Sequence, residues 1–196
     1  MKQAAGTLRT EHDCGLAQAV GRLVAARLER ALAELGPVSA ETLLAPGKLL
    51  RTRLVARLAE GLGADPAPLA PACAAVELVH LASLCHDDVI DGAVLRRSAP
   101  TLWRTAGCAA AVLIGDVLLC EGIDLVAGID DGRWCAAFAS KVRQMCAAEA
   151  RQELLLRGLA PAPEAYVQQC RRKTGSLFAF GPRLLPPGQW LGQLWE

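Results

Sequence analysis

Residues 69 to 91, LAPACAAVELVHLASLCHDDVID, join a long apolar run to a cluster of charges. Alanine and leucine are favourable in a helix, and the run is long enough for about six helical turns. The Gly- and Pro-containing turn EGLGADPAP precedes it and gives the helix a clear beginning. We therefore predict a helix from about Leu69 to Ile90, followed by a charged loop from Asp91 to Thr101.

The rest of the chain has the same helical character, because apolar residues recur at helical spacing and β-branched residues are sparse. Further helices are predicted over residues 3–34, from the N-cap Ser39 to about 61, from 107 to about 129, over 134–157, and from Pro161 onward. After Phe180, three prolines and three glycines fall within sixteen residues, which predicts an irregular tail over 181–196. No strand-like alternation of any length is present. The prediction is one all-α domain spanning residues 1–196.

Composition limits the class of protein. Of 196 residues, 53% are hydrophobic, which is enough for one domain with a substantial core. The net charge is +1 and no basic stripe is interleaved with aromatic residues, which argues against a nucleic-acid partner. The N-terminus lacks the apolar core of a signal peptide, and acidic residues interrupt the apolar run 107–129 too often for a bilayer span. We expect a cytoplasmic protein that is not an integral membrane protein.

Cysteines and one carboxylate are expected in the core. The eight cysteines occur singly, with no CxxC pair and only three histidines in the chain, so a zinc cluster is not expected. Most of them lie in apolar helical patterns, where a free thiol behaves as a small hydrophobe. Asp116, flanked by AAAVLIG and VLLC, is also expected to be buried and to need a partner.

The charges at the end of the helix 69–90 fall on one face. At 3.6 residues per turn, His80, Asp87 and Asp91 share a stripe, and Asp88 lies beside Asp87. Carboxylates four residues apart repel each other, and the helix C-terminus is already partially negative, so a divalent cation would relieve the arrangement. Oxygen ligands favour Mg²⁺, which binds through a few carboxylates and substrate phosphates. The alternative is a solvated helix end.

Cations and a hydroxyl elsewhere could bind an anion held by such a metal. The loop after the helix 69–90 contains Arg96 and Arg97. GKLLR contains Lys48 and Arg51, three residues apart, and RRKTGSLF contains Lys173 and Thr174. Guanidinium groups suit phosphate oxygens because their donors are forked. For the pairs in GKLLR and RRKTGSLF, the alternative is the solvated edge of an amphipathic helix.

Five segments, in order, resemble the trans-isoprenyl diphosphate synthases (polyprenyl synthetases). GKLLR (47–51) is similar to the family's GGKxxRP element, and ELVHLASLCHDDVID (77–91) to its first aspartate-rich region. RRSAPT (96–101) resembles RRGxPT, GDVLL (115–119) resembles GDxLL, and KTGSLF (173–178) resembles KTxxLF. The resemblance covers about residues 40–180. It implies an antiparallel helical bundle of the isoprenoid synthase type.

The resemblance also implies three sets of site residues. The catalytic and Mg²⁺-binding set is Asp87, Asp88 and Asp91. The set that would bind the diphosphate of isopentenyl diphosphate is Lys48, Arg51, His80 and Arg97. The allylic prenyl diphosphate would be held by the metal with Arg96, while Lys173 and Thr174 would lie near its leaving group. In the family chemistry, metal-assisted loss of diphosphate gives an allylic cation. The double bond of isopentenyl diphosphate attacks that cation, and the leaving diphosphate takes the released proton.

The sequence departs from the family pattern in two places. The second aspartate-rich motif, FQxxDDxxD, has no counterpart after KTGSLF, and the chain ends well short of the family's usual length. Pro46 and Thr52 also differ from GGKxxRP. Three interpretations follow: an enzyme that is shortened or completed by another subunit, a catalytically inactive or regulatory partner that dimerises with a full-length synthase, or a truncated product without activity. Family members are typically dimers, so a homo- or hetero-dimer is expected.

Overall fold

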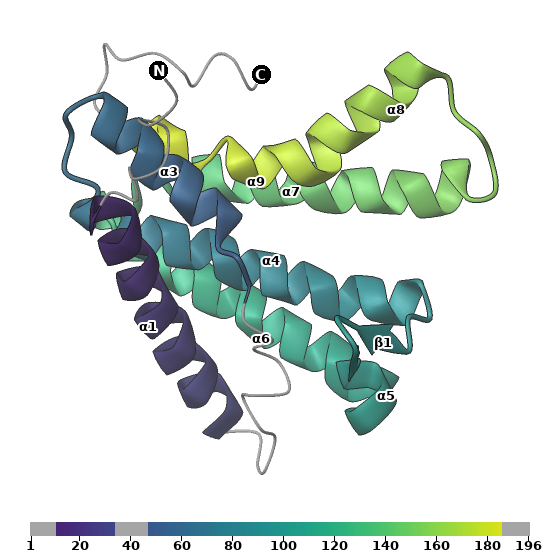
Figure 1. Cartoon of the computed structure of the whole chain (residues 1–196). Coiled ribbons are helices and arrows are strands. Elements are labelled where there is room, and N and C mark those ends of the chain that lie inside the picture. Colours follow the sequence, from purple (N-terminus) through teal and green to yellow (C-terminus); the bar gives the residue numbers. More distant parts are fainter. Residues whose placement is uncertain (1–10, 34–46, 186–196) are drawn as a thin grey trace, which may run out of the picture.

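The computed structural model describes residues 11–33 and 47–185 as a bundle of helices (Figure 1). The α-helices are α1 (Glu11–Ala33), α3 (Leu50–Gly61), α4 (Ala70–Ile90), α5 (Leu102–Ala106), α6 (Cys108–Ala127), α7 (Cys135–Arg151), α8 (Pro163–Cys170) and α9 (Ser176–Phe178). Short 3-10 turns are η1 (Ala67–Leu69), η2 (Asp130–Gly132) and η5 (Gly181–Leu184), and π-helical turns are η3 (Gln152–Leu156) and η4 (Arg171–Gly175). The all-α prediction is confirmed. Ser39, the predicted N-cap, and the tail beyond residue 185 lie outside the described residues.

The charged loop after α4 contains a short pair of strands that the sequence did not predict. β1 (Leu95–Arg96) and β2 (Ala99–Pro100) pair antiparallel, with Leu95 opposite Pro100 and Arg96 opposite Ala99. The turn between them has positive φ at both central residues, 50° at Arg97 and 68° at Ser98. Two such residues form the tight turn that matches the twist of a hairpin. Strands of two residues are too short to show alternation in the sequence.

Prolines and glycines lie at several helix ends. Pro71 and Pro163 lie in the first turns of α4 and α8, where the missing N–H costs nothing. Gly63, with φ of 63°, follows the end of α3, and Gly92, with φ of 65°, follows α4. These left-handed positions end the helices without the steric cost that a side chain would add.

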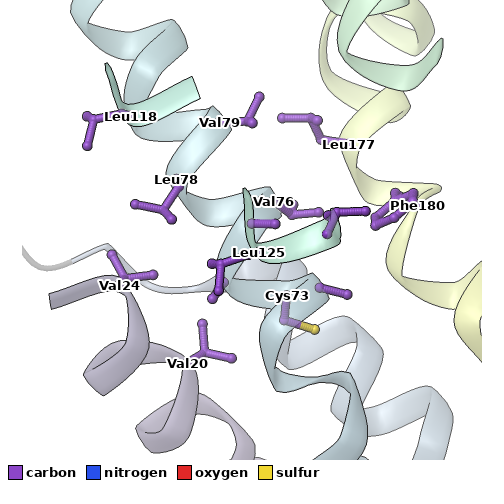
Figure 2. Close-up of a cluster of buried hydrophobic side chains, with 14 of the residues drawn as sticks. Val20, Val24, Cys73, Val76, Leu78, Val79, Leu118, Leu125, Leu177 and Phe180 are labelled. Carbon is purple, nitrogen blue, oxygen red and sulfur yellow. The ribbon is translucent and has the colours of Figure 1, made fainter. Parts of the chain in front are cut away.

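The core is centred on α4, whose side chains are all buried from Ala72 to Val79. Figure 2 shows this cluster, with Val20 and Val24 of α1 on one side and Leu177 and Phe180 on another. α6 runs antiparallel to α4 (Figure 1) and contributes Leu118 and Leu125. The two helices pack closely, because a Cβ placed on Gly122 would lie 3.1 Å from the carbonyl oxygen of Ala75.

A second helical pair lies beside α4. α7 runs outward, and α8 returns along it and continues through η4 into α9 (Figure 1). The rings of Phe138 and Phe180 pack with centroids 4.9 Å apart and tie the base of this pair to the core. Its far end projects beyond the core, where Leu154, Leu159 and Tyr166 are exposed.

One stretch, Ala67–Ile90, is long and apolar enough to cross a membrane by length and composition alone. It is η1 with α4, the central helix of the bundle, and 67% of its apolar window is buried inside the fold. Burial within the bundle accounts for its apolar character.

Two burial predictions are wrong. Asp116 has a side chain that is 57% exposed. Of the cysteines in the described side chains, Cys73 and Cys85 are buried, but four are exposed: Cys108, Cys120, Cys146 and Cys170. For Asp116, Cys108 and Cys120 the reason is that α6 keeps apolar residues on its surface, such as Leu113 and Ile123, so apolar neighbours in sequence do not imply burial.

Candidate active site

A cavity of about 490 Å³ lies between α4 on one side and α7, η3 and η4 on the other. It is lined by five of the residues predicted for the site: Arg51, His80, Asp87, Lys173 and Thr174. The remaining wall is mostly apolar and includes Val79, Ala82, Leu84, Ile90, Leu119, Val142 and Met145. A cavity with charged groups and a long apolar wall suits a ligand with an anionic head and a hydrocarbon tail.

Asp87 carries the carboxylate of α4 that faces this cavity. Burial and the nearby carboxylate of Glu149 together raise its pKa to about 6, although the ammonium of Lys173 acts in the opposite direction. Among the described residues, no side chain forms an ion pair with Asp87. Its charge is therefore poorly compensated by the protein, which is the condition in which a bound cation would be stabilised.

Lys173 reaches the cavity from the opposite wall and contacts a residue that sequence analysis missed. Its Nζ lies 2.5 Å from Oε2 of Glu149 on α7. Lys173 and Thr174 belong to the π turn η4, and Glu153 and Leu154 in the lining belong to the π turn η3. A π turn adds a residue to the helical repeat, so side chains change face relative to an ideal α-helix.

Asp88 points away from the cavity although it follows Asp87 directly. It is 5% exposed, and its two oxygens accept hydrogen bonds from Arg96: Nε lies 3.0 Å from Oδ1 and 3.1 Å from Oδ2, and Nη2 lies 2.6 Å from Oδ1. The bidentate contact raises the pKa of Arg96. Both residues line a smaller cavity on the other side of α4. Asp91, at the exposed C-cap of α4, does not line the main cavity. The roles of Asp88, Asp91 and Arg96 stay predictions.

Arg51 lies at the base of the cavity beside a buried carboxylate. Its guanidinium carbon is 4.9 Å from the ring centroid of Phe178. Glu77, buried behind it, accepts hydrogen bonds from Thr52, from Oγ1 at 3.0 Å and from the backbone N–H at 3.4 Å. Burial raises the pKa of Glu77, whereas the charge of Arg51 lowers it. The family pattern has proline at the position of Thr52. In this chain the backbone N–H and the hydroxyl of Thr52 donate hydrogen bonds to the Glu77 carboxylate, and proline has neither donor.

His80 is held neutral on the same wall. Burial, together with the positive charges of Arg51, Arg96 and Arg97, lowers its pKa to about 4. A neutral ring can both donate and accept one hydrogen bond at physiological pH.

Lys48 and Arg97 are exposed and do not line the cavity. Their roles in binding also stay predictions.

Magnesium fits the cavity only if the substrate supplies part of its coordination. Among the side chains of residues 15–33 and 47–185, no three His, Cys, Asp or Glu side chains are grouped to hold a metal by themselves. Mg²⁺ keeps several waters and binds through one or two carboxylates together with substrate phosphates. Asp87, a carboxylate on the cavity wall with no ion-pair partner among the described residues, matches that mode.

The acidic and histidine residues of the cavity that were not predicted from the sequence are Glu149, Glu153 and His86. Glu149 on α7 and Glu153 on η3 lie four residues apart, a charge pattern that could have identified them. His86 also lines the cavity, and its Nε2 lies 3.1 Å from the carbonyl oxygen of Val112 and 3.3 Å from Oδ1 of Asp116. Gly115 permits this approach, since a Cβ there would lie 2.3 Å from Nε2 of His86.

Comparisons with known proteins agree with this fold. A short chain isoprenyl diphosphate synthase from Methanothermobacter thermautotrophicus is 31% identical over 163 residues, covering 77% of this chain and 50% of its own length. The heptaprenyl diphosphate synthase component 2 of Geobacillus stearothermophilus is 33% identical over 156 residues, covering 78% of this chain and 49% of its own. The chain thus spans half or less of the length of the curated relatives it matches.

A solved structure shows the same fold. The polyprenyl synthase from Caulobacter crescentus CB15, crystallised with calcium and isoprenyl diphosphate, is 28% identical and superposes with a TM-score of 0.73. The match covers 86% of this chain and 51% of that one. The bundle is therefore of the isoprenoid synthase type, as the resemblance implied. A family model for polyprenyl synthetases matches residues 33–185, and this chain belongs to the polyprenyl synthetase family.

Proposed function

We propose that this chain is a Mg²⁺-dependent prenyltransferase of isoprenoid biosynthesis, which condenses isopentenyl diphosphate with an allylic prenyl diphosphate. The observation that carries the proposal is the cavity of about 490 Å³, in which Asp87 on α4 faces Lys173 on η4. Carboxylate and ammonium groups meet at one side, and apolar side chains line the rest. That arrangement suits a metal-bound diphosphate attached to a hydrocarbon chain.

The residues of the cavity would act through binding and exclusion of water. When bound, Mg²⁺ supplies Lewis acidity to the leaving diphosphate. Asp87 would hold it, and Lys173 and Thr174 would donate hydrogen bonds to the same diphosphate. Arg51 and the neutral ring of His80 would hold isopentenyl diphosphate, with Lys48 and Arg97 completing that site. The apolar walls would keep water from an allylic cation, which water would otherwise quench.

An elongation assay tests the proposal. The purified chain is incubated with Mg²⁺, labelled isopentenyl diphosphate, and farnesyl or geranylgeranyl diphosphate. We expect elongated prenyl products from the wild type and none from the Asp87→Ala, Asp88→Ala variant. Absence of product with the wild type would refute the proposed catalytic activity of this chain.

A second candidate function is that of a non-catalytic or regulatory partner of a full-length synthase. It is supported by exposed apolar residues on α6, such as Leu113 and Ile123. The name of the Geobacillus stearothermophilus relative describes that protein as one component of a synthase. Co-purification with a full-length synthase, without elongation by the chain alone, would favour this candidate.

We also propose that the chain forms a dimer and is located in the cytoplasm. The exposed apolar residues of α6 would form the contact of a homo- or hetero-dimer, because burying them is favourable. Light scattering of the wild type and of Leu113→Asp would test this, with a smaller particle expected for the variant. A cytoplasmic location is proposed as well, and cell fractionation would test it.

A further inference from the structure

The ion pair between Lys173 and Glu149 joins η4 to α7 inside the cavity. The two charged atoms are 2.5 Å apart, and the side chains are only 28% and 16% exposed. A pair that is largely removed from water is screened less than a surface pair. Lys173, the cation expected to meet a leaving diphosphate, is therefore already bound by a carboxylate of the same chain.

The charges around this pair disfavour an anion that arrives without a cation. Asp87 faces the pair from α4 and interacts electrostatically with both partners. Two carboxylates and one ammonium leave this side of the cavity net negative. Glu153 also lines the cavity, but its carboxylate pairs with Arg157 one turn along. A diphosphate carries several negative charges, so it must both overcome Asp87 and displace Glu149 from Lys173.

We propose that Glu149 is a specificity-determining residue, an internal counter-ion of Lys173 that makes the site reject metal-free diphosphate and accept the metal-bound form. This inference rests on the proposed function, because it takes Lys173 as a ligand of the diphosphate. When a metal-bound diphosphate enters, Lys173 exchanges the Glu149 carboxylate for a phosphate oxygen. The carboxylates of Glu149 and Asp87 then face the positive charge that the metal brings. The step is an exchange of ion pairs, and no covalent bond changes.

The test measures binding of inorganic pyrophosphate to the full chain by calorimetry, once with Mg²⁺ and once with a chelator. Glu149→Gln keeps the shape of the side chain and removes its charge. We expect this variant to bind metal-free pyrophosphate about five- to tenfold more tightly than the wild type, as loss of a competing, partly buried ion pair implies. Its affinity in the presence of Mg²⁺ should change little or fall, so the preference for the metal-bound form narrows.

Two further variants separate this mechanism from a general charge effect. Glu153→Gln removes one negative charge from the same cavity, about one turn beyond Glu149 in η3, and it should leave metal-free binding unchanged because Glu153 pairs with Arg157 and not with Lys173. In the double variant Glu149→Gln, Lys173→Met, the tighter binding of metal-free pyrophosphate should disappear, because it depends on the released ammonium. The proposal would be overturned if Glu153→Gln raised the affinity for metal-free pyrophosphate as much as Glu149→Gln does. It would also be overturned if the higher affinity of Glu149→Gln persisted when Lys173→Met was added, or if folded Glu149→Gln showed no higher affinity than the wild type.

The outcomes also distinguish this inference from the proposed function. If the chain elongates prenyl diphosphates and Glu149→Gln shows no gain, only the role of Glu149 fails. If the pyrophosphate pattern is as expected and no elongation occurs, the diphosphate site stands and the catalytic proposal fails.

Discussion

Three aspartates within one helical turn have three different environments in this protein. Asp87 is half-buried on the cavity wall, Asp88 is buried against Arg96, and Asp91 is exposed at the helix end. A helix turns about 100° per residue, so neighbours in sequence face different elements. The sequence motif alone could not distinguish these roles, because each role depends on what the opposite element supplies. For Asp87 that element is α7 with η4, and for Asp88 it is the loop that carries Arg96.

The lowered pKa of His80 predicts that the free energy of unfolding depends on pH. Its pKa in the folded protein is about 4, below the ordinary value of about 6.5. Between these values the unfolded chain binds a proton that the folded chain does not, so the stability from this group is present above about pH 6.5 and is lost as the pH falls toward 4. We expect wild type to lose on the order of 1 kcal/mol more than His80→Gln between pH 7 and pH 5.

Urea unfolding of both proteins at the two pH values measures this difference. Asp87, whose pKa is raised, contributes a slope of opposite sign that is common to both proteins and cancels in the comparison. Identical losses in wild type and His80→Gln would show that His80 is protonated in the folded state.

The sequence predicted which residues line the cavity better than it predicted which side chains are buried. Arg51, His80, Asp87, Lys173 and Thr174 were selected from motifs and do line one cavity. Asp116 was expected in the core and is exposed, because its apolar neighbours on α6 partly face solvent as well. Burial depends on which face of a helix meets another element, and that is not encoded by local composition.

At the scale of elements, the close packing of α4 against α6 depends on glycine. A Cβ on Gly122 would lie 3.1 Å from the carbonyl oxygen of Ala75 and 3.1 Å from Cγ2 of Val79. Glycine normally weakens a helix by about 1 kcal/mol relative to alanine. The contact with α4 explains why it is tolerated here.

Gly122→Ala is therefore expected to destabilise the protein by about 1–3 kcal/mol, because backbone atoms of α4 must move to admit the methyl group. Gly21→Ala in α1 is a matched control, since a Cβ there would meet nothing within 4 Å. It should stabilise the protein by about 0.5–1 kcal/mol through helix propensity. Thermal unfolding of both variants checks the prediction, and equal effects of the two substitutions would contradict it.

A second element contact, between α1 and α6, is polar. Glu121 is 8% exposed, and Nη2 of Arg30 lies 2.7 Å from each of its oxygens. Arg27 contributes a further bond at 2.9 Å. A double-mutant cycle of Arg30→Ala and Glu121→Gln should give a coupling free energy of about 1–3 kcal/mol. The same cycle at the more exposed pair Arg57 and Glu60 should give less than about 0.5 kcal/mol, and a larger value there would be inconsistent with this account.

Element positions could be predicted because apolar periodicity, proline and glycine act locally. The helix expected from about Leu69 to Ile90 is α4, Ala70–Ile90. The helix expected over 134–157 is α7 followed by the π turn η3. The π turns could not be predicted, since an added residue in the repeat leaves no signal in composition. They matter for function because Lys173 and Thr174 lie in one of them.

At the scale of the whole molecule, the cavity arises from two helical pairs that meet along α4 (Figure 1). The order of motifs in the sequence predicted the family and the fold. It could not show how Glu149 of α7 would approach Lys173, because that contact depends on how the second helical pair folds back on itself. We propose that this cavity binds an allylic diphosphate through a metal that Asp87 would hold.

The most direct test is calorimetric titration of farnesyl diphosphate into the purified chain, with Mg²⁺ and with a chelator. The account predicts saturable binding that requires Mg²⁺ in wild type, is lost in Asp87→Asn, and is retained in Asp131→Asn, whose carboxylate is exposed outside the cavity. Binding that is equally strong without Mg²⁺, or that persists in Asp87→Asn, would contradict it.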